Sequence, residues 1–205
     1  MALNFTIKGS EEIRLKSYYL CGSIPSNLSI RTWFSFLISE IIRPYQKALY
    51  SKPVRGLHWV DGISAPYISE TKTDKHYFND AGDIYSDKVS KFALQLIAKT
   101  NELPILRLSQ IYDRIYIDEC QDLAGYDLDF IEVLLNADIE LILVGDPRQK
   151  TYSTHFARKS PGTRTGQGID EILKSWHSEG KCDLEYQSIS HRCVQKICDY
   201  ADLIN

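Results

Sequence analysis

The sequence lacks any long hydrophobic run. No stretch of about 18 consecutive apolar residues occurs, so a membrane-spanning helix is not expected. The first ten residues, MALNFTIKGS, also lack a charged leader before an apolar stretch, and we therefore expect no signal peptide. These absences predict a protein without a membrane partner.

Neither sign of charge dominates the composition. The chain has 24 Lys and Arg residues against 27 Asp and Glu residues, a formal net charge of -3. A protein of this charge does not hold nucleic acid by its overall field, so nucleic-acid binding would need a local patch or aromatic stacking.

The five cysteines lack the C-x-x-C spacing of disulfide or zinc motifs. This pattern predicts reduced thiols and a cytoplasmic location. His191, Cys193 and Cys198 with Cys182 could be read as a zinc site, but H-x-C-x4-C matches no usual zinc knuckle. Packed or partly exposed free thiols are the preferred interpretation.

The chain does have enough hydrophobic residues, 43% of 205, to bury a core in one domain, with or without a modest insertion. Apolar runs predict strands, and three- or four-residue spacing predicts helices. The expected strands are 2–6, 28–32, 114–117, 140–144 and 183–186, and the expected helices are 10–16, 33–42, 86–99, 128–135, 169–176 and 194–204. The alternation predicts an α/β fold with a parallel sheet, whose ligands bind beyond the carboxyl ends of the strands.

Two predicted strands end in polar residues. Ile115–Ile117 lead into Asp118, Glu119, Cys120, Gln121 and Asp122, and the next strand leads through Gly145 to Gln149. An isolated Asp-Glu pair would normally cap the following helix, but a hydrophobic strand before it favours a ligand site. Asp118 is suited to magnesium and Glu119 to orienting or deprotonating water.

These residues resemble known motifs. D-E-x-Q-D at 118–122 and G-D-x-x-Q at 145–149 resemble motifs II and III of UvrD/Rep-like superfamily 1 helicases. Residues 2–10 resemble motif Ia, residues 30–36 resemble motif Ib, and Ser190–Cys193 with Ile197 and 200–202 resemble motif IV. Residues 39–44 are also similar to the UvrD-like subunits of Gabija-type antiphage defence.

The resemblance implies a RecA-like parallel sheet with helices on both faces, an incomplete P-loop NTPase fold with a small inserted subdomain. Residues 1–44 and 84–186 would be part of helicase domain 1A, residues 45–83 a 1B-like insertion, and residues 187–205 the start of domain 2A. Proline and glycine residues and the loss of periodicity also predict an insertion near 45–83.

The resemblance also implies roles in ATP hydrolysis, with ATP and Mg²⁺ as cofactors. Asp118, in the Walker B motif, would bind magnesium and Glu119 would activate water. Gln149 would sense the γ-phosphate and Arg192 would reach it, while Gln121 would couple the strand ends to the nucleotide state.

A path for single-stranded or partly duplex DNA is implied as well. It would be lined by Phe5, Thr6, Trp33, Phe34, Ser35 and Tyr152. From spacing alone, core packing is the favoured interpretation of Phe5, Trp33 and Phe34. The family pattern after motif III also differs here, because Thr154 and His155 replace an aromatic residue and an arginine.

The sequence contains no G-x-x-x-x-G-K-[ST] phosphate loop, and the glycine-rich residues 160–168 do not provide one. The preferred hypothesis is therefore a fragment or truncated form of a helicase that hydrolyses ATP poorly by itself. Its partners would be DNA and the rest of the helicase chain or a nuclease. The alternative is a naturally short, non-catalytic subunit that binds DNA or a partner, and a generic nucleotide-binding domain ranks last.

Overall fold

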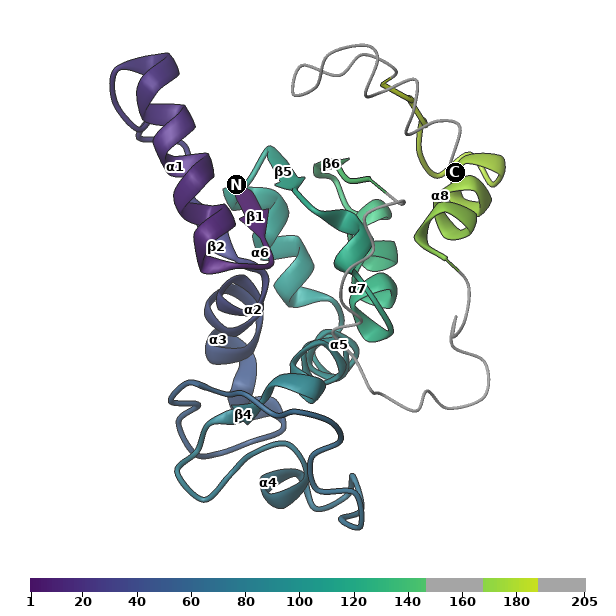
Figure 1. Ribbon diagram of the computed structural model, residues 1–205. Helices are drawn as coiled ribbons and strands as arrows, with labels where there is room; N and C mark the ends of the chain where they lie inside the picture. Colours follow the sequence, from purple (N-terminus) through teal and green to yellow (C-terminus); the bar gives the residue numbers. More distant parts are fainter. Residues whose placement is uncertain (147–167, 188–205) are drawn as a thin grey trace.

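The computed structural model describes residues 1–146 and 168–187 (Figure 1). The strands are β1 (Ala2–Asn4), β2 (Ile30–Thr32), β3 (Leu57–His58), β4 (Ile84–Tyr85), β5 (Arg114–Ile117) and β6 (Glu140–Leu143). The longer helices are α1 (Ile7–Cys21), α5 (Val89–Lys99), α6 (Leu103–Ile111), α7 (Tyr126–Leu135) and α8 (Ile169–Ser178). Short helical segments are α2 (Trp33–Phe36), the π-helix η1 (Leu37–Ile42), α3 (Arg43–Tyr45), α4 (Thr73–His76), and the 3-10 turns η2 (Gln46–Ala48), η3 (Ser86–Lys88) and η4 (Cys120–Asp122).

Four strands form one parallel sheet in the order β2-β1-β5-β6. The nitrogen of Met1 donates a hydrogen bond to the carbonyl of Arg114 (2.9 Å), so β1 joins a strand that is far away in the sequence. Helices flank this sheet (Figure 1). The predicted α/β class, with a RecA-like parallel sheet, is confirmed.

Different helices cover the two faces of the sheet. The β1–α1–β2 crossover runs toward one edge and the β5–α7–β6 crossover toward the other, so right-handed connections place α1 and α7 on opposite faces. Leu3, Ile115 and Ile117 are buried in the large core that includes α5 and α7. On the α1 face, Tyr116 is 38% exposed and its neighbour Ile142 is only half-buried. The second face is therefore thinly covered over β5 and β6.

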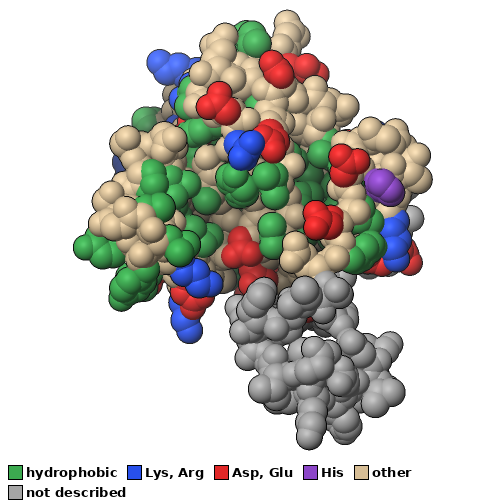
Figure 2. Space-filling view, turned by 90° about the horizontal axis from the view of Figure 1, so that it is seen from above, with side chains coloured by type: hydrophobic (Ala, Val, Ile, Leu, Met, Phe, Trp, Pro, Cys, Tyr) green, Lys and Arg blue, Asp and Glu red, His purple; other side chains and the backbone are tan. Residues whose placement is uncertain are grey.

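Helix α1 begins at Ile7, before the predicted start at Ser10. Thr6 is the cap, because its Oγ1 accepts a hydrogen bond from the amide of Gly9 (2.9 Å) and satisfies a free donor of the first turn. Ser10 is buried inside the helix. The helix exposes several large hydrophobic side chains: Ile7, Leu15, Tyr18, Tyr19 and Leu20. Figure 2 shows hydrophobic side chains on the side of the molecule where α1 lies.

The apolar helix predicted over 33–42 is present, but it does not stop before Pro44. Its second part is a π-helix, in which the amide of Arg43 bonds to the carbonyl of Ile38. Pro44 has no N–H for the carbonyl of Glu40, and Arg107 Nη1 donates to that carbonyl instead (3.2 Å). The wider π turn and this external donor allow the helical path to continue to Tyr45.

The structure also differs from the prediction at residues 183–186 and 103–111. The strand predicted at 183–186 is wrong, because residues 181–187 form no regular structure. Helix α6 was not predicted, although Pro104 in its first turn is a typical helix-start signal. The helix predicted at 194–204 lies outside the described residues.

The region predicted as an insertion, 45–83, has little regular structure. Strands β3 and β4 pair over two residues only, and the ring of Tyr50 stacks on Phe78 with centroids 3.9 Å apart. The ammonium group of Lys88 donates to the carbonyls of Ser64 and His76, each at 2.8 Å. Aromatic packing and one buried lysine hold this region, and its assignment as a separate subdomain stays a prediction.

Candidate ATP-hydrolysis site

The carboxyl ends of β1 and β5 bring Asn4 and Asp118 together. Asn4 Nδ2 donates to Asp118 Oδ2 (3.1 Å), and the other carboxylate oxygen accepts from the amide of Glu119 (3.0 Å). The amide of Asp118 donates to the carbonyl of Leu3 (2.9 Å), which continues the ladder to the end of the strand. The Asp118 carboxylate therefore has a defined orientation at the edge where parallel sheets bind ligands.

Glu119 and Gln121 connect the ends of β5 and β6. Glu119 has φ 58° and ψ 42°, a left-handed conformation that is unfavourable for a glutamate and turns the chain sharply after the strand. Gln121 Nε2 donates to Glu119 Oε2, and Gln121 Oε1 accepts from the amide of Asp146 (3.2 Å). One buried amide thus contacts both the predicted water-activating carboxylate and the loop after β6.

Gly145 makes this close approach of the two loops possible. A Cβ at this position would lie 2.4 Å from Gln121 Oε1, 2.7 Å from Cys120 Sγ and 3.0 Å from the Cys120 amide nitrogen. No side chain fits there without displacing the bridge. The atoms that surround Gly145 therefore give the physical reason for a glycine at this position.

The environment raises the pKa of two groups in this acidic loop. Burial, with the negative charge of Asp118 adding to it, raises the pKa of the Cys120 thiol to about 11. Burial and then the charge of Glu119 raise the pKa of Asp122 above its ordinary value. Both shifts reflect closely spaced carboxylates at a partly desolvated strand end.

Asn4 is a site residue that the sequence analysis missed. It is buried, its Oδ1 accepts from the amide (2.9 Å) and hydroxyl (3.1 Å) of Thr6, and its Nδ2 reaches Asp118. A Cβ on Gly9 would fall 2.2 Å from Asn4 Oδ1, so glycine leaves room for this amide. A polar residue ending an apolar strand at the ligand edge was the available signal.

The residues predicted to contact DNA differ in how exposed their side chains are. Thr6 and Ser35 are exposed, whereas Phe5 is half-buried against Trp33 with ring centroids 5.9 Å apart. Trp33 is fully buried and donates from Nε1 to Asp127 Oδ1 (2.8 Å), and Phe34 is 8% exposed. The three rings take part in packing, and their contact with DNA stays a prediction.

The other predicted site residues, Gln149, Tyr152 and Arg192, lie outside the described residues. The predicted γ-phosphate sensor, arginine and motif III stacking residue therefore have no structural account. Of the predicted nucleotide-site residues, the structure brings together Asp118, Glu119 and Gln121.

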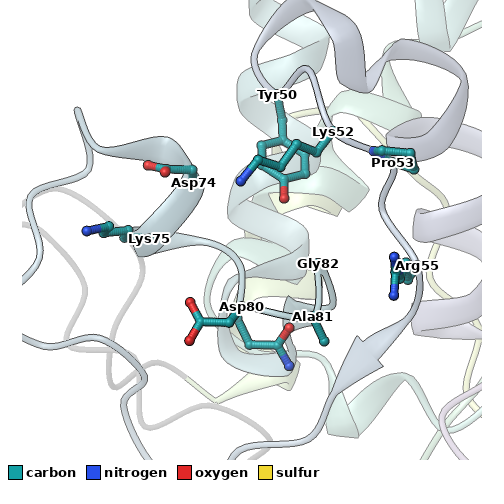
Figure 3. A pocket seen from close by; sticks show the side chains of 10 residues that line it. Tyr50, Lys52, Pro53, Arg55, Asp74, Lys75, Asp80, Ala81 and Gly82 are labelled. Atoms are coloured by element: carbon teal, nitrogen blue, oxygen red, sulfur yellow. The ribbon is translucent and has the colours of Figure 1, made fainter.

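A separate cavity of about 320 Å³ lies in the insertion (Figure 3). Lys52 and Arg55 line it together with Asp74, Lys75 and Asp80. Opposite charges face the same space, so the cavity does not favour one ionic ligand. None of the residues that line it belongs to the acidic loop at Asp118.

Magnesium and ATP are the groups that the resemblance implies for this site. In the described parts of the chain, no three His, Cys, Asp or Glu side chains form a metal-binding group. Magnesium often takes only one or two protein carboxylates together with phosphate oxygens, so Asp118 fits magnesium that arrives with a nucleotide. Within those same parts, no helix combines the length and hydrophobicity needed to cross a bilayer.

The parallel sheet, with an acidic loop at its carboxyl edge, is consistent with the RecA-like class of nucleotide-binding domains. Residues 69–160 match the family model of the UvrD/REP helicase N-terminal domain, so this part of the chain is similar to UvrD-like helicases. The match supports the predicted resemblance to UvrD-like helicases, while the individual motifs and the similarity to Gabija-type subunits stay predictions. The residues predicted as motifs Ia, Ib and IV fall outside the matched residues. Among curated proteins, no relative matched the chain.

Proposed function

We propose that the chain is part of an ATP-dependent UvrD-like DNA helicase and contributes the side of the ATP site that activates water. The observation that carries this proposal is the Gln121 bridge, because it links Glu119 after β5 to the loop after β6. A shared contact of this kind lets nucleotide chemistry at one strand end affect the next.

Each residue has a role in this proposal. Asp118, oriented by Asn4, would hold magnesium, and Glu119 would accept the proton of an attacking water. Magnesium-bound ATP would supply the phosphoryl group that is transferred. Gln149 and Arg192 are assigned to the γ-phosphate by resemblance alone.

The proposal that the chain is a fragment is supported by β6. Leu141 to Leu143 of β6 and the following Val144 are continuously apolar, as in strands buried on both faces of a parallel sheet, yet Val144 is 55% exposed. Among the described residues β6 pairs only with β5. A further strand at this edge, followed by a phosphate loop and a helix on the α1 face, would complete the sheet and the ATP site.

The test is ATP turnover by this chain with Mg²⁺ and single-stranded DNA. Because the sequence has no phosphate loop, we expect phosphate release at background, both for the chain and for Glu119→Gln. Glu185→Gln, a change at an exposed glutamate outside the site, is the matched control. Robust turnover that is lost in Glu119→Gln and kept in Glu185→Gln would support the role of Glu119 but overturn the claim that the missing phosphate loop is essential, and robust turnover that is kept in Glu119→Gln would contradict the proposed role of Glu119.

The second candidate is a naturally short subunit that binds DNA or a partner without hydrolysing ATP. The exposed hydrophobic side chains of α1 favour it, since large exposed apolar groups often mark protein contacts. Translation of the DNA immediately upstream of Met1 separates the two candidates. An in-frame strand with G-x-x-x-x-G-K-T supports the fragment, whereas a stop codon and ribosome-binding site support the short subunit.

A further inference from the structure

The insertion presents one tryptophan, Trp59, that is both exposed and fixed in place. Its side chain is 67% exposed. On one side of it, His58 pairs with Tyr85 in the β3–β4 ladder, and on the other, the amide of Val60 donates to Ser86 Oγ (3.0 Å). A large apolar side chain on an anchored backbone costs little additional conformational entropy when it binds a ligand.

Trp59 lies against the beginning of the helical segment that follows β2. Its ring contacts Phe34 edge-to-face, with centroids 6.0 Å apart and planes at 73°. Phe34 is almost completely covered, whereas the next residue, Ser35, is exposed. Trp59 therefore presents an accessible aromatic surface at a place where the aromatic residues of the predicted DNA path, Trp33 and Phe34, are buried.

We propose that Trp59 stacks on a base of single-stranded DNA and supplies the aromatic platform beside residues 33–35. This inference rests on the proposed helicase function and adds to it a binding residue outside the segment that matches the helicase family. Every base has an aromatic face, so a stacking residue binds a strand without sequence preference.

The overall charge of the chain makes stacking more important than phosphate attraction for DNA binding. The chain has a net charge of -3, and its overall field does not attract phosphates. The carboxyl ends of β1 and β2, which lead into Thr6 and Trp33, lie at the same edge as Asp118, so a strand bound beside Trp59 would pass the loops of the candidate ATP site.

A protein partner is the competing occupant, because Leu57 and Ile63 in the same segment are also partly exposed.

Tryptophan fluorescence reports directly on the proposed contact. The chain has three tryptophans, and Trp33 and Trp176 are both fully buried. Titration with a dT oligonucleotide should therefore quench the emission of Trp59. The same titration of Trp59→Phe should leave the emission of the two buried tryptophans unchanged.

Affinity for the fluorescently labelled oligonucleotide is the second measurement. Trp59→Ala should weaken binding roughly 5- to 150-fold, the range expected for loss of one base–aromatic stack. Trp59→Phe should retain most of the affinity because the ring is conserved. The control Tyr19→Ala removes an exposed aromatic residue of α1 and should leave the affinity unchanged.

An abasic oligonucleotide separates stacking from a structural effect of the substitution. It has the phosphates but no bases, so wild type and Trp59→Ala should bind it equally weakly. If Trp59→Ala binds the dT oligonucleotide as tightly as wild type and no quenching occurs, the Trp59 proposal is overturned while DNA binding stands. If wild type binds no single strand at all, the DNA part of the proposed function fails together with it.

Self-association gives a third distinguishable result. If Trp59 emission shifts with protein concentration in the absence of DNA, and the dT oligonucleotide produces no further change, the residue contacts a second copy of the chain. That result would overturn the stacking proposal in favour of a protein interface.

Discussion

At the scale of single residues, the contact between Gly9 and Asn4 is open to a direct test. In Gly9→Ala the new Cβ would lie 2.2–2.5 Å from three atoms of the Asn4 amide group, which must move away from Asp118 and Thr6. Crowding of this kind should lower the free energy of unfolding by about 1–3 kcal/mol. Urea denaturation measures the change.

Gly168→Ala is the matched control for Gly9→Ala. A Cβ at Gly168 meets no atom within 4 Å, so its effect should stay within about 0.5 kcal/mol. Combining Gly9→Ala with Asn4→Ala should recover part of the loss, because the smaller side chain frees the space. Equal stability of Gly9→Ala and wild type would show that Asn4 is not held as described.

Part of the candidate site could be predicted from the sequence, residue by residue. Asp118, Glu119 and Gln121 stand close together in the sequence after an apolar strand, so their proximity follows from the local pattern. Asn4 lies 114 residues away from Asp118, and only the pairing of β1 with β5 brings them together. Trp59 lies in a segment without periodicity, so no local rule could separate it from other loop residues.

At the scale of elements, Lys88 should control the stability of the insertion. Lys88→Met leaves the carbonyls of Ser64 and His76 without their donor, which should cost about 1–3 kcal/mol locally. Hydrogen exchange should accelerate in residues 64–76. Lys72→Met, which changes an exposed lysine in the same region, should have little effect.

The same lysine predicts a pH dependence of stability. Burial lowers the pKa of Lys88 below its usual 10.5, so the unfolded chain binds more protons than the folded chain between the lowered value and 10.5. Stability from this group therefore rises with pH in that window and is lost as pH falls through the lowered pKa. Lys88→Met should remove this dependence, and a parallel dependence in both proteins would contradict it.

Most elements were predictable because their residues alone select them. The apolar runs of β5 and β6 and the spacing of α5 and α7 specify strand and helix before any tertiary contact forms. The continuation through Pro44 was not predictable, because it depends on a donor from Arg107 on another helix. Residues 183–186 alternate acidic and apolar side chains, as a half-buried strand does, but gain no pairing partner among the described residues.

At the scale of the whole molecule, hydrogen exchange at the outer edge of β6 should show whether the sheet lacks a further strand. The amide of Glu140 bonds to Asp113 and that of Val144 bonds to Ile117, so the amides of Leu141 and Leu143 point away from β5. In this chain these two amides should exchange with solvent faster than those inside the sheet. In a longer polypeptide with a phosphate loop they should become protected, and slow exchange in the chain alone would contradict an open edge.

The place of β1 in the sheet also has a consequence for the time course of folding. Met1 bonds to Arg114 across 113 residues, and β1 lies between β2 and β5. At usual translation speeds, β1 is synthesised about 6–23 s before its partner β5. During that interval β1 and the apolar surface of α1 have no completed sheet to join. In contrast, β5 and β6 are connected only through α7 and can pair as soon as they emerge. The last pairing to form is therefore the one that brings Asn4 to Asp118, and the candidate site is completed only when the longest loop closes.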